Sequence, residues 1–211
     1  MGFGIGVEYA RYGYEVNLYN TKEESSRNAM RECRVALDLM AETGLISKPE
    51  ADAAYRRLHP TIDLATAVQG ADFVVESVLE ILTLKKEIFG KLDKLCPPAV
   101  IIATNTSGLR VTDITAGLTH PERVLATHYF QPAHFIPLVE VCAGEKTDVK
   151  FIQKAVKILQ GMHKTPVVMK VEINAFIGNR IQGAIGRVCH ELVDSGAATP
   201  EMIDDVITYG F

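Results

Sequence analysis

A-V-I-I-A-T-N-T-S-G-L at Ala99–Leu109 and V-L-A-T-H-Y-F-Q-P-A-H-F-I-P-L-V-E-V at Val124–Val141 are the stretches that decide the fold. Each contains short apolar runs that stop abruptly at polar residues, which include Ser107, His128 and Glu140. Buried strands that end in polar side chains are typical of the carboxyl edge of an open α/β sheet. A serine, a histidine and a carboxylate placed there are candidates for a polar substrate site, so these stretches indicate an enzyme.

Strand and helix patterns alternate outward from these stretches. We expect strands at residues 14–19, 73–75, 100–103, 124–126, 138–141 and 166–171. We expect helices at residues 3–12, 63–68, 84–95, 111–117 and 149–162, and a helical hairpin inserted near residues 21–58. The alternation stops near residue 172, and only helical patterns follow. The sequence therefore predicts an α/β domain with a mostly parallel sheet in residues 1–172 and the beginning of an all-helical domain in residues 173–211.

The chain opens with a helix, whereas a Rossmann-like nucleotide domain normally opens with a strand and a glycine-rich turn. Gly2, Gly4 and Gly6 lie at the start of this helix, where they suit either such a turn or close packing of the helix on the sheet. The next strand ends at Asn20, where dinucleotide sites usually carry an acidic residue that binds the ribose. Asn20 either contacts a ribose or merely ends a strand, and it repels a 2′-phosphate less than aspartate does. We therefore expect a Rossmann-like sheet that lacks its usual first strand.

Composition excludes several classes of protein. A net charge of −4 gives no reason to expect nucleic acid or an anionic membrane surface as a partner. No apolar run reaches the about 20 residues that a membrane span needs, and the N-terminus has no signal-like pattern. The four cysteines lack the spacing of a zinc site or a disulfide framework, so we expect no metal and a cytoplasmic location.

A series of motifs in order resembles one known family. These motifs are M-G-F-G-I (1–5), A-D-F-V-V-E-S-V-L-E (71–80), T-N-T-S-G-L (104–109), T-H-Y-F-Q-P (127–132), P-L-V-E-V (137–141) and F-I-G-N-R (176–180). The chain resembles the 3-hydroxyacyl-CoA dehydrogenases, which include 3-hydroxybutyryl-CoA dehydrogenases and the related lambda-crystallin and carnitine dehydrogenase branches. The resemblance implies an NAD-binding domain followed by an all-helical dimerisation domain, and thus a homodimer with a role in fatty acid metabolism.

The resemblance also implies roles for individual residues. His128 and Glu140 match the catalytic histidine and glutamate of the family. Ser107 matches a serine that contacts both the substrate hydroxyl and the nicotinamide, and Asn179 matches an asparagine that polarises the substrate. Further candidates for contact with the cofactor are Glu80 and Lys85, which follow the third strand of the family's sheet.

The chain departs from the family pattern at the cofactor side. The family's first strand and the first two glycines of its dinucleotide fingerprint are absent, and Gly2 matches the third glycine. Asn20 replaces the aspartate that binds the ribose, and Gln131 replaces an asparagine that contacts the cofactor. We therefore expect a family member truncated at both ends.

Oxidation of a secondary alcohol needs a base for the hydroxyl proton and an acceptor for the hydride. Histidine is the natural base near neutral pH, and a carboxylate on its other nitrogen fixes the tautomer. We assign these roles to His128 and Glu140, with NAD as the hydride acceptor and NADP as the alternative. Each of these residues also has a purely structural interpretation. His128 could be a structural histidine, Glu140 a surface charge at a strand end, and Ser107 the N-cap of the next helix. Exposed polar positions are the alternative for Asn179, Glu80 and Lys85.

The substrate is open between two classes. A 3-hydroxyacyl-CoA comes first, because the resemblance as a whole favours it. A small hydroxy acid or carnitine comes second, because the hairpin near residues 21–58 carries equal numbers of acidic and basic residues and no basic stripe that would suit phosphates. A third possibility is a catalytically inert chain that only packs or oligomerises.

Overall fold

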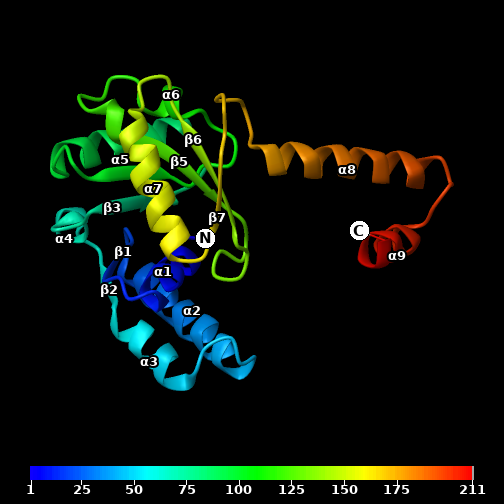
Figure 1. Ribbon diagram of the computed structural model, residues 1–211, viewed down its shortest axis with the longest axis horizontal. Coiled ribbons are helices and arrows are strands. Elements are labelled where there is room, and N and C mark those ends of the chain that lie inside the picture. The colour runs from blue at the N-terminus through cyan, green and yellow to red at the C-terminus, as the bar shows by residue number, and fades with distance from the viewer. Residues whose placement is uncertain (211) are drawn as a thin grey trace. The chain divides into compact units, whose positions relative to one another are not determined.

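The computed structural model describes residues 1–210, which belong to two compact units. The first runs from Met1 to Asn174 and contains all the strands among the described residues; the second begins at Ala175. The first unit has helices on both sides of a mostly parallel sheet, so the predicted Rossmann-like α/β class is confirmed (Figure 1).

The larger sheet has five strands in the order β3-β4-β5-β6-β7. Their bounds are Phe73–Glu76, Ile101–Thr104, Val124–Tyr129, Leu138–Ala143 and Thr165–Val168. All neighbours are parallel except β5 and β6, which pair antiparallel. All residues of β4 and β5 are buried, as expected for central strands covered on both faces.

A separate two-stranded sheet pairs β1 (Val16–Tyr19) with β2 (Leu58–Thr61) in parallel. The sequence pattern did not predict β2. Pro60 has no N–H group to donate to a neighbouring strand, and His59 and Pro60 break the apolar pattern that is typical of a strand. Within residues 1–210, β1 and β3 pair with no strand on their other sides. In residues 1–210 the strands thus form two sheets, which are separate where the first strand of a Rossmann-like fold would lie.

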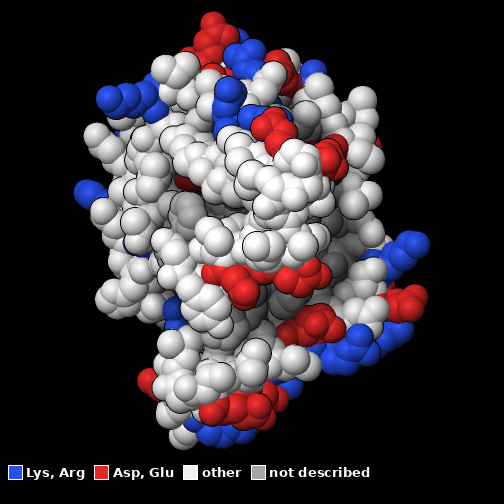
Figure 2. All heavy atoms as spheres, turned by 90° about the vertical axis from the view of Figure 1, so that its right-hand side faces the viewer, with Lys and Arg blue, Asp and Glu red and all other residues white. Residues whose placement is uncertain are grey.

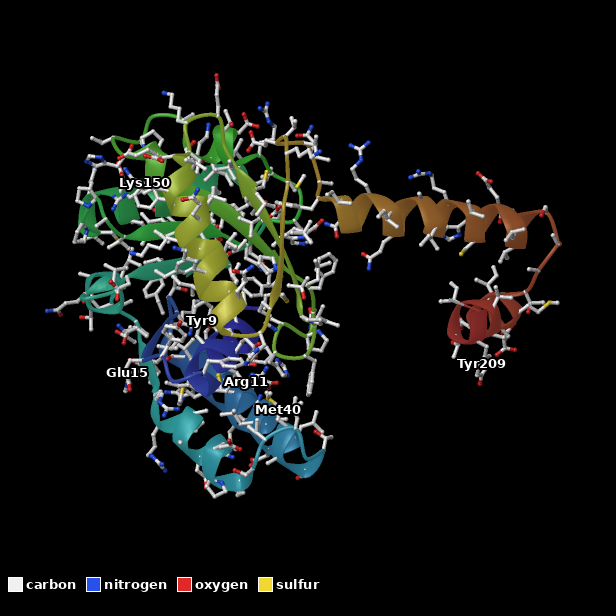
Figure 3. All side chains as sticks on the ribbon, viewed as in Figure 1. Tyr9, Arg11, Glu15, Met40, Lys150 and Tyr209 are labelled. Atoms are coloured by element: carbon white, nitrogen blue, oxygen red, sulfur yellow. The ribbon has the colours of Figure 1, made fainter. Side chains whose placement is uncertain are left out.

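Two helices and the larger sheet enclose the main core. α1 (Gly2–Arg11) contributes Ile5 and Tyr9, and α7 (Val149–Gly161) lies across the strands (Figure 1). Alternate residues of β4 and β5, among them Ile101 and Leu125, face the same cluster. The hydroxyl of Tyr9, labelled in Figure 3, lies 3.2 Å from that of Tyr129 within this core.

The other helices of the first unit surround this frame. They are α2 (Glu23–Glu42), α3 (Lys48–Arg56), α4 (Leu64–Val68), α5 (Leu82–Leu95), α6 (Val111–Ile114) and the short 3-10 helix η1 (Pro121–Arg123). α2 and α3 form the predicted hairpin and share a second core with α1. A capping box of Ser47 and Glu50 starts α3. α6 is shorter than the predicted helix at 111–117, and Gly117 at φ +92° follows it in a turn.

The second unit consists of α8 (Ile177–Asp194) and α9 (Pro200–Gly210) among the described residues. Tyr209 of α9 is 84% exposed (Figure 3). In the part of the chain that the structure describes, every helix is too short or too polar to cross a bilayer. Figure 2 shows that both acidic and basic side chains are exposed among the described residues.

Candidate active site

His128 and Glu140 face each other across the antiparallel pair β5–β6. The register places them directly opposite, and Nδ1 of His128 lies 2.8 Å from Oε2 of Glu140. Both side chains are at least 94% buried, so the pair is shielded from bulk water. The carboxylate engages Nδ1, so exchange of a proton with a substrate would take place at the other ring nitrogen, Nε2.

The loop after β4 carries Ser107 and is held by Glu80. Oε1 of Glu80 accepts hydrogen bonds from the backbone N–H groups of Ser107 (3.0 Å), Gly108 (2.8 Å) and Leu109 (3.3 Å), and also from the hydroxyl of Thr106. Ser107 does not cap the next helix, whose N-cap is Arg110. Glu80 therefore fixes the conformation of the loop that presents Ser107.

Burial raises the pKa of Glu80, but the hydrogen bonds from Thr106 and Gly108, together with the nearby Lys85 ammonium, outweigh burial. The net result is a pKa below the usual value for glutamate. Glu80 is accordingly ionised at neutral pH and remains a strong acceptor for the loop.

Asn105 links the Ser107 loop to the histidine strand, and the sequence analysis had not singled it out. Its side-chain oxygen accepts a hydrogen bond from the backbone N–H of Tyr129, at 2.9 Å, next to His128. Its own N–H donates to the backbone oxygen of Glu76 at 2.7 Å. The signal was present in T-N-T-S-G-L, where an asparagine directly follows a buried strand.

Lys85 is fully buried and pairs with carboxylates. Its Nζ lies 2.9 Å and 3.0 Å from the two carboxylate oxygens of Glu76, and 3.4 Å from Oε2 of Glu80. Thr104 donates a further hydrogen bond to Glu76. These contacts join the ends of β3 and β4 to α5, and they orient Glu80. Lys85 therefore has a structural role, and its contact with a cofactor stays a prediction.

The other predicted cofactor residues lie around α1 and β1. Gly2 is the first residue of α1, and Gln131 lines a small hollow beside that helix. Asn20 directly follows β1, where its N–H donates to the backbone oxygen of Thr61 at 3.0 Å. Asn179 lies on α8 in the second unit and is therefore described apart from the others.

The N-terminus of α1 fits an anionic part of a dinucleotide. Its N-cap, Met1, makes no side-chain capping bond, and the first turn contains no acidic residue. A Cβ atom added at Gly4 would lie only 3.1 Å from Nδ1 of His134, so a glycine at this position allows His134 to pack closely against the helix. Uncapped N–H groups at a helix N-terminus bind phosphate groups well. Among the described residues, no group of histidine, cysteine or acidic side chains is arranged to hold a metal ion.

Comparisons with known proteins identify relatives of the whole chain. The chain is 32% identical over 210 residues to 5-formyl-3-hydroxy-2-methylpyridine 4-carboxylate 5-dehydrogenase of Mesorhizobium japonicum, and it covers 67% of that protein. It is 35% identical over 210 residues to L-carnitine dehydrogenase of Streptomyces coelicolor, of which it covers 65%. Both matches include all of this chain.

Among solved structures, that of 3-hydroxybutyryl-CoA dehydrogenase from Escherichia coli matches with a TM-score of 0.89 at 30% identity. The match covers 95% of this chain and 42% of that one. The family model for the NAD binding domain of 3-hydroxyacyl-CoA dehydrogenase matches residues 1–172. The chain therefore belongs to the 3-hydroxyacyl-CoA dehydrogenase family, with its NAD-binding domain in residues 1–172.

Proposed function

We propose that the protein oxidises the secondary hydroxyl of a 3-hydroxyacyl-CoA to a ketone, with NAD as the hydride acceptor. The observation that carries this proposal is the buried pair of His128 and Glu140, with 2.8 Å between Nδ1 and Oε2. A paired, shielded imidazole suits removal of a hydroxyl proton near neutral pH. The family supports the choice of cofactor.

In this mechanism Nε2 of His128 takes the proton from the substrate hydroxyl as the carbon–hydrogen bond breaks. Glu140 holds the ring in the required tautomer and stabilises the imidazolium that forms. Ser107 donates a hydrogen bond to the substrate oxygen, on which negative charge develops during the reaction. The role of Asn179 in polarising the substrate, which the family resemblance implies, stays a prediction. NAD, when bound, supplies the site that accepts the hydride.

A small hydroxy acid or carnitine is the second candidate substrate. In support, the relative from Streptomyces coelicolor is named an L-carnitine dehydrogenase. The basic residues of the α2–α3 hairpin are also partly neutralised within it: Arg34 contacts Asp38 and Asp52, and Lys48 contacts Asp38. Paired cations attract the phosphates of CoA less strongly than unpaired ones.

A steady-state assay of NADH formation separates these candidates. Purified protein is supplied with NAD and, in parallel, with 3-hydroxybutyryl-CoA, free 3-hydroxybutyrate or L-carnitine. The proposal expects the largest kcat/KM for the CoA thioester. A larger value for carnitine or the free acid supports the second candidate, and no NADH with any of the three supports the inert alternative.

We further propose a cytoplasmic homodimer that assembles through the helical unit and acts in fatty acid metabolism. Apolar side chains recur at helical spacing on α8 and are exposed; they are Ile177, Ile181, Ile185, Val188 and Leu192. Such a face suits a partner helix. Sedimentation equilibrium of the wild type and of Ile181→Glu tests the dimer, because a charge on this face should shift the protein to the monomer.

A further inference from the structure

Lys164 is buried between α7 and β7, and its ammonium group contacts three oxygen atoms. The residue directly precedes β7 and is only 6% exposed. Its Nζ donates hydrogen bonds to the backbone oxygens of Ala133 at 2.7 Å and of Ile136 at 2.9 Å. Nζ also lies 2.7 Å from Oε1 of Glu8 in α1. An ammonium group has three N–H donors, so these three oxygen atoms match its full capacity.

Two of these oxygen atoms belong to residues 130–137, the connecting segment that joins β5 to β6. The two strands carry His128 and Glu140, which form the proton-transfer pair of the proposed mechanism. Next to Lys164, the backbone N–H of Thr165 donates to the backbone oxygen of Pro137 at 2.8 Å. The start of β7 therefore holds the connecting segment at several points, and the strongest contacts come from the charged donor.

The connecting segment is too long for its own turn geometry to fix how β5 and β6 pair. A two-residue hairpin turn sets the register of its strands, whereas a longer segment leaves the register open. In the observed register His128 lies opposite Glu140, with 2.8 Å between Nδ1 and Oε2. A shift by one residue would turn Glu140 to the other face of the sheet. Contacts that hold the segment in place therefore help to keep the proton-transfer pair together.

Glu8 has a different part in this cluster. Its carboxylate neutralises the buried ammonium charge of Lys164, and it also lies 2.6 Å from Nε of Arg11. Among the described contacts it reaches the connecting segment only through Lys164. Loss of Glu8 would therefore remove a counter-charge, whereas loss of Lys164 would release two carbonyl groups of the segment. Glu8 would keep a cationic partner in Arg11 without Lys164, so the two effects are separable by substitution.

We propose that Lys164 is a positioning residue for the proton-transfer pair. Its ammonium group fixes the connecting segment through the carbonyls of Ala133 and Ile136, and the fixed segment keeps Glu140 opposite His128. This inference rests on the dehydrogenase function proposed above, because the pair matters for rate only if His128 is the base. Lys164 itself touches neither member of the pair and acts through the backbone alone.

Four variants separate positioning from stability. Lys164→Met removes every donor, and Lys164→Gln keeps an N–H group on a side chain that is one atom shorter. Glu8→Gln breaks the same ion pair but leaves the ammonium group and its two carbonyl contacts. Lys157→Met is the control, because Lys157 is exposed on α7. For each variant, kcat is measured with 3-hydroxybutyryl-CoA and NAD, beside the Kd of NADH and the melting temperature. Nitrogen-15 NMR of histidine-labelled protein reports the tautomer of His128, whose signal is assigned by its loss in His128→Gln.

We expect Lys164→Met to lower kcat by about tenfold or more, because a displaced carboxylate no longer orients the imidazole. The Kd of NADH should stay within about twofold of the wild type, and Lys164→Gln should recover part of kcat. His128 should carry its proton on Nδ1 in the wild type and populate both tautomers in Lys164→Met. Glu8→Gln should lower the melting temperature, yet keep kcat and the tautomer of the wild type. Lys157→Met should change none of these quantities.

The inference is wrong if Lys164→Met retains the kcat and the His128 tautomer of the wild type. It is also wrong if Glu8→Gln lowers kcat as much as the Lys164 variants do, because the loss then follows from the broken ion pair and not from the released carbonyls. Should Lys164→Met not fold, the comparison of Lys164→Gln with Glu8→Gln decides by the same criteria. If the wild type forms no NADH, the proposed function fails, and the tautomer of His128 in the variants still decides whether Lys164 positions the pair.

Discussion

Replacing Glu140 by glutamine removes the negative charge beside His128 while it preserves the shape of the side chain. The two side chains are buried and their contact atoms lie 2.8 Å apart. With an effective dielectric constant of about 20, attraction between an imidazolium and a carboxylate at that distance is about 6 kcal/mol. Loss of that attraction in the transition state corresponds to about four orders of magnitude in rate.

The measurement is kcat with 3-hydroxybutyryl-CoA and NAD, alongside the Kd of NADH. We expect Glu140→Gln to reduce kcat by about 10⁴-fold and to leave the Kd of NADH nearly unchanged, as the carboxylate acts through the histidine. Glu145→Gln is the control, since Glu145 is exposed just after β6. A kcat for Glu140→Gln within about tenfold of the wild type would refute the role assigned to this pair.

Four predictions concern stability, measured by urea unfolding. Glu80→Ala should cost about 1 kcal/mol at neutral pH, since its side chain is 37% exposed and solvent screens its bonds. Because the folded pKa of Glu80 lies below its ordinary value of 4.5, this contribution is present above pH 4.5 and disappears as the pH falls through the folded value. Glu8→Ala should cost about 3–5 kcal/mol, because it leaves Lys164 buried without its counter-charge. Gly144→Ala should destabilise by about 1–3 kcal/mol, because its Cβ would lie 2.8 Å from a packed valine and 3.2 Å from backbone. Gly90→Ala, with open space around it inside α5, should instead stabilise by up to about 1 kcal/mol.

Glu15→Ala serves as the control for the first two variants, because Glu15 is exposed and pairs with the surface residue His59. A Glu80 variant that loses as much stability at acidic pH as at neutral pH would contradict the proposed ionisation. A Glu8 variant as stable as the control would mean that the buried cations do not depend on this carboxylate. Equal effects of the two glycine substitutions would show that packing around Gly144 is looser than described.

The apolar runs that end in Ser107, His128 and Glu140 were enough to predict the sheet and the side of it that carries the site. Strand period and burial are local properties, so sequence reveals them directly. The antiparallel pairing of β5 with β6, which places His128 opposite Glu140, depends on the path of the segment between them. No periodicity in the sequence encodes that path, so the direct contact followed only from the resemblance to a family.

Polar contacts between residues far apart in the sequence could not be predicted, for a different reason. Glu8 and Lys164 meet in the core although they lie at opposite ends of the first unit's sequence, and each resembles a surface charge when considered alone. Lys85 likewise looked exposed on its helix, yet it is fully buried against Glu76. β2 escaped prediction because Pro60 is atypical of strands and is tolerated here in a strand that pairs on one side only.

The split sheet also has a consequence for the cooperativity of unfolding. In residues 1–210 no ladder hydrogen bonds join β1 to β3, and the hairpin side has its own cluster of buried residues, which includes Leu37 and Met40. Coupling between the two halves of the first unit therefore relies on packing of α1, of Val16 in β1 and of α4 rather than on a continuous sheet. Amide hydrogens of β1, β2 and the hairpin should exchange with deuterium as one group, at a lower opening free energy than those of β4 and β5. We therefore expect β1, β2 and the hairpin to unfold locally and refold many times while the strands that carry His128 and Glu140 stay folded.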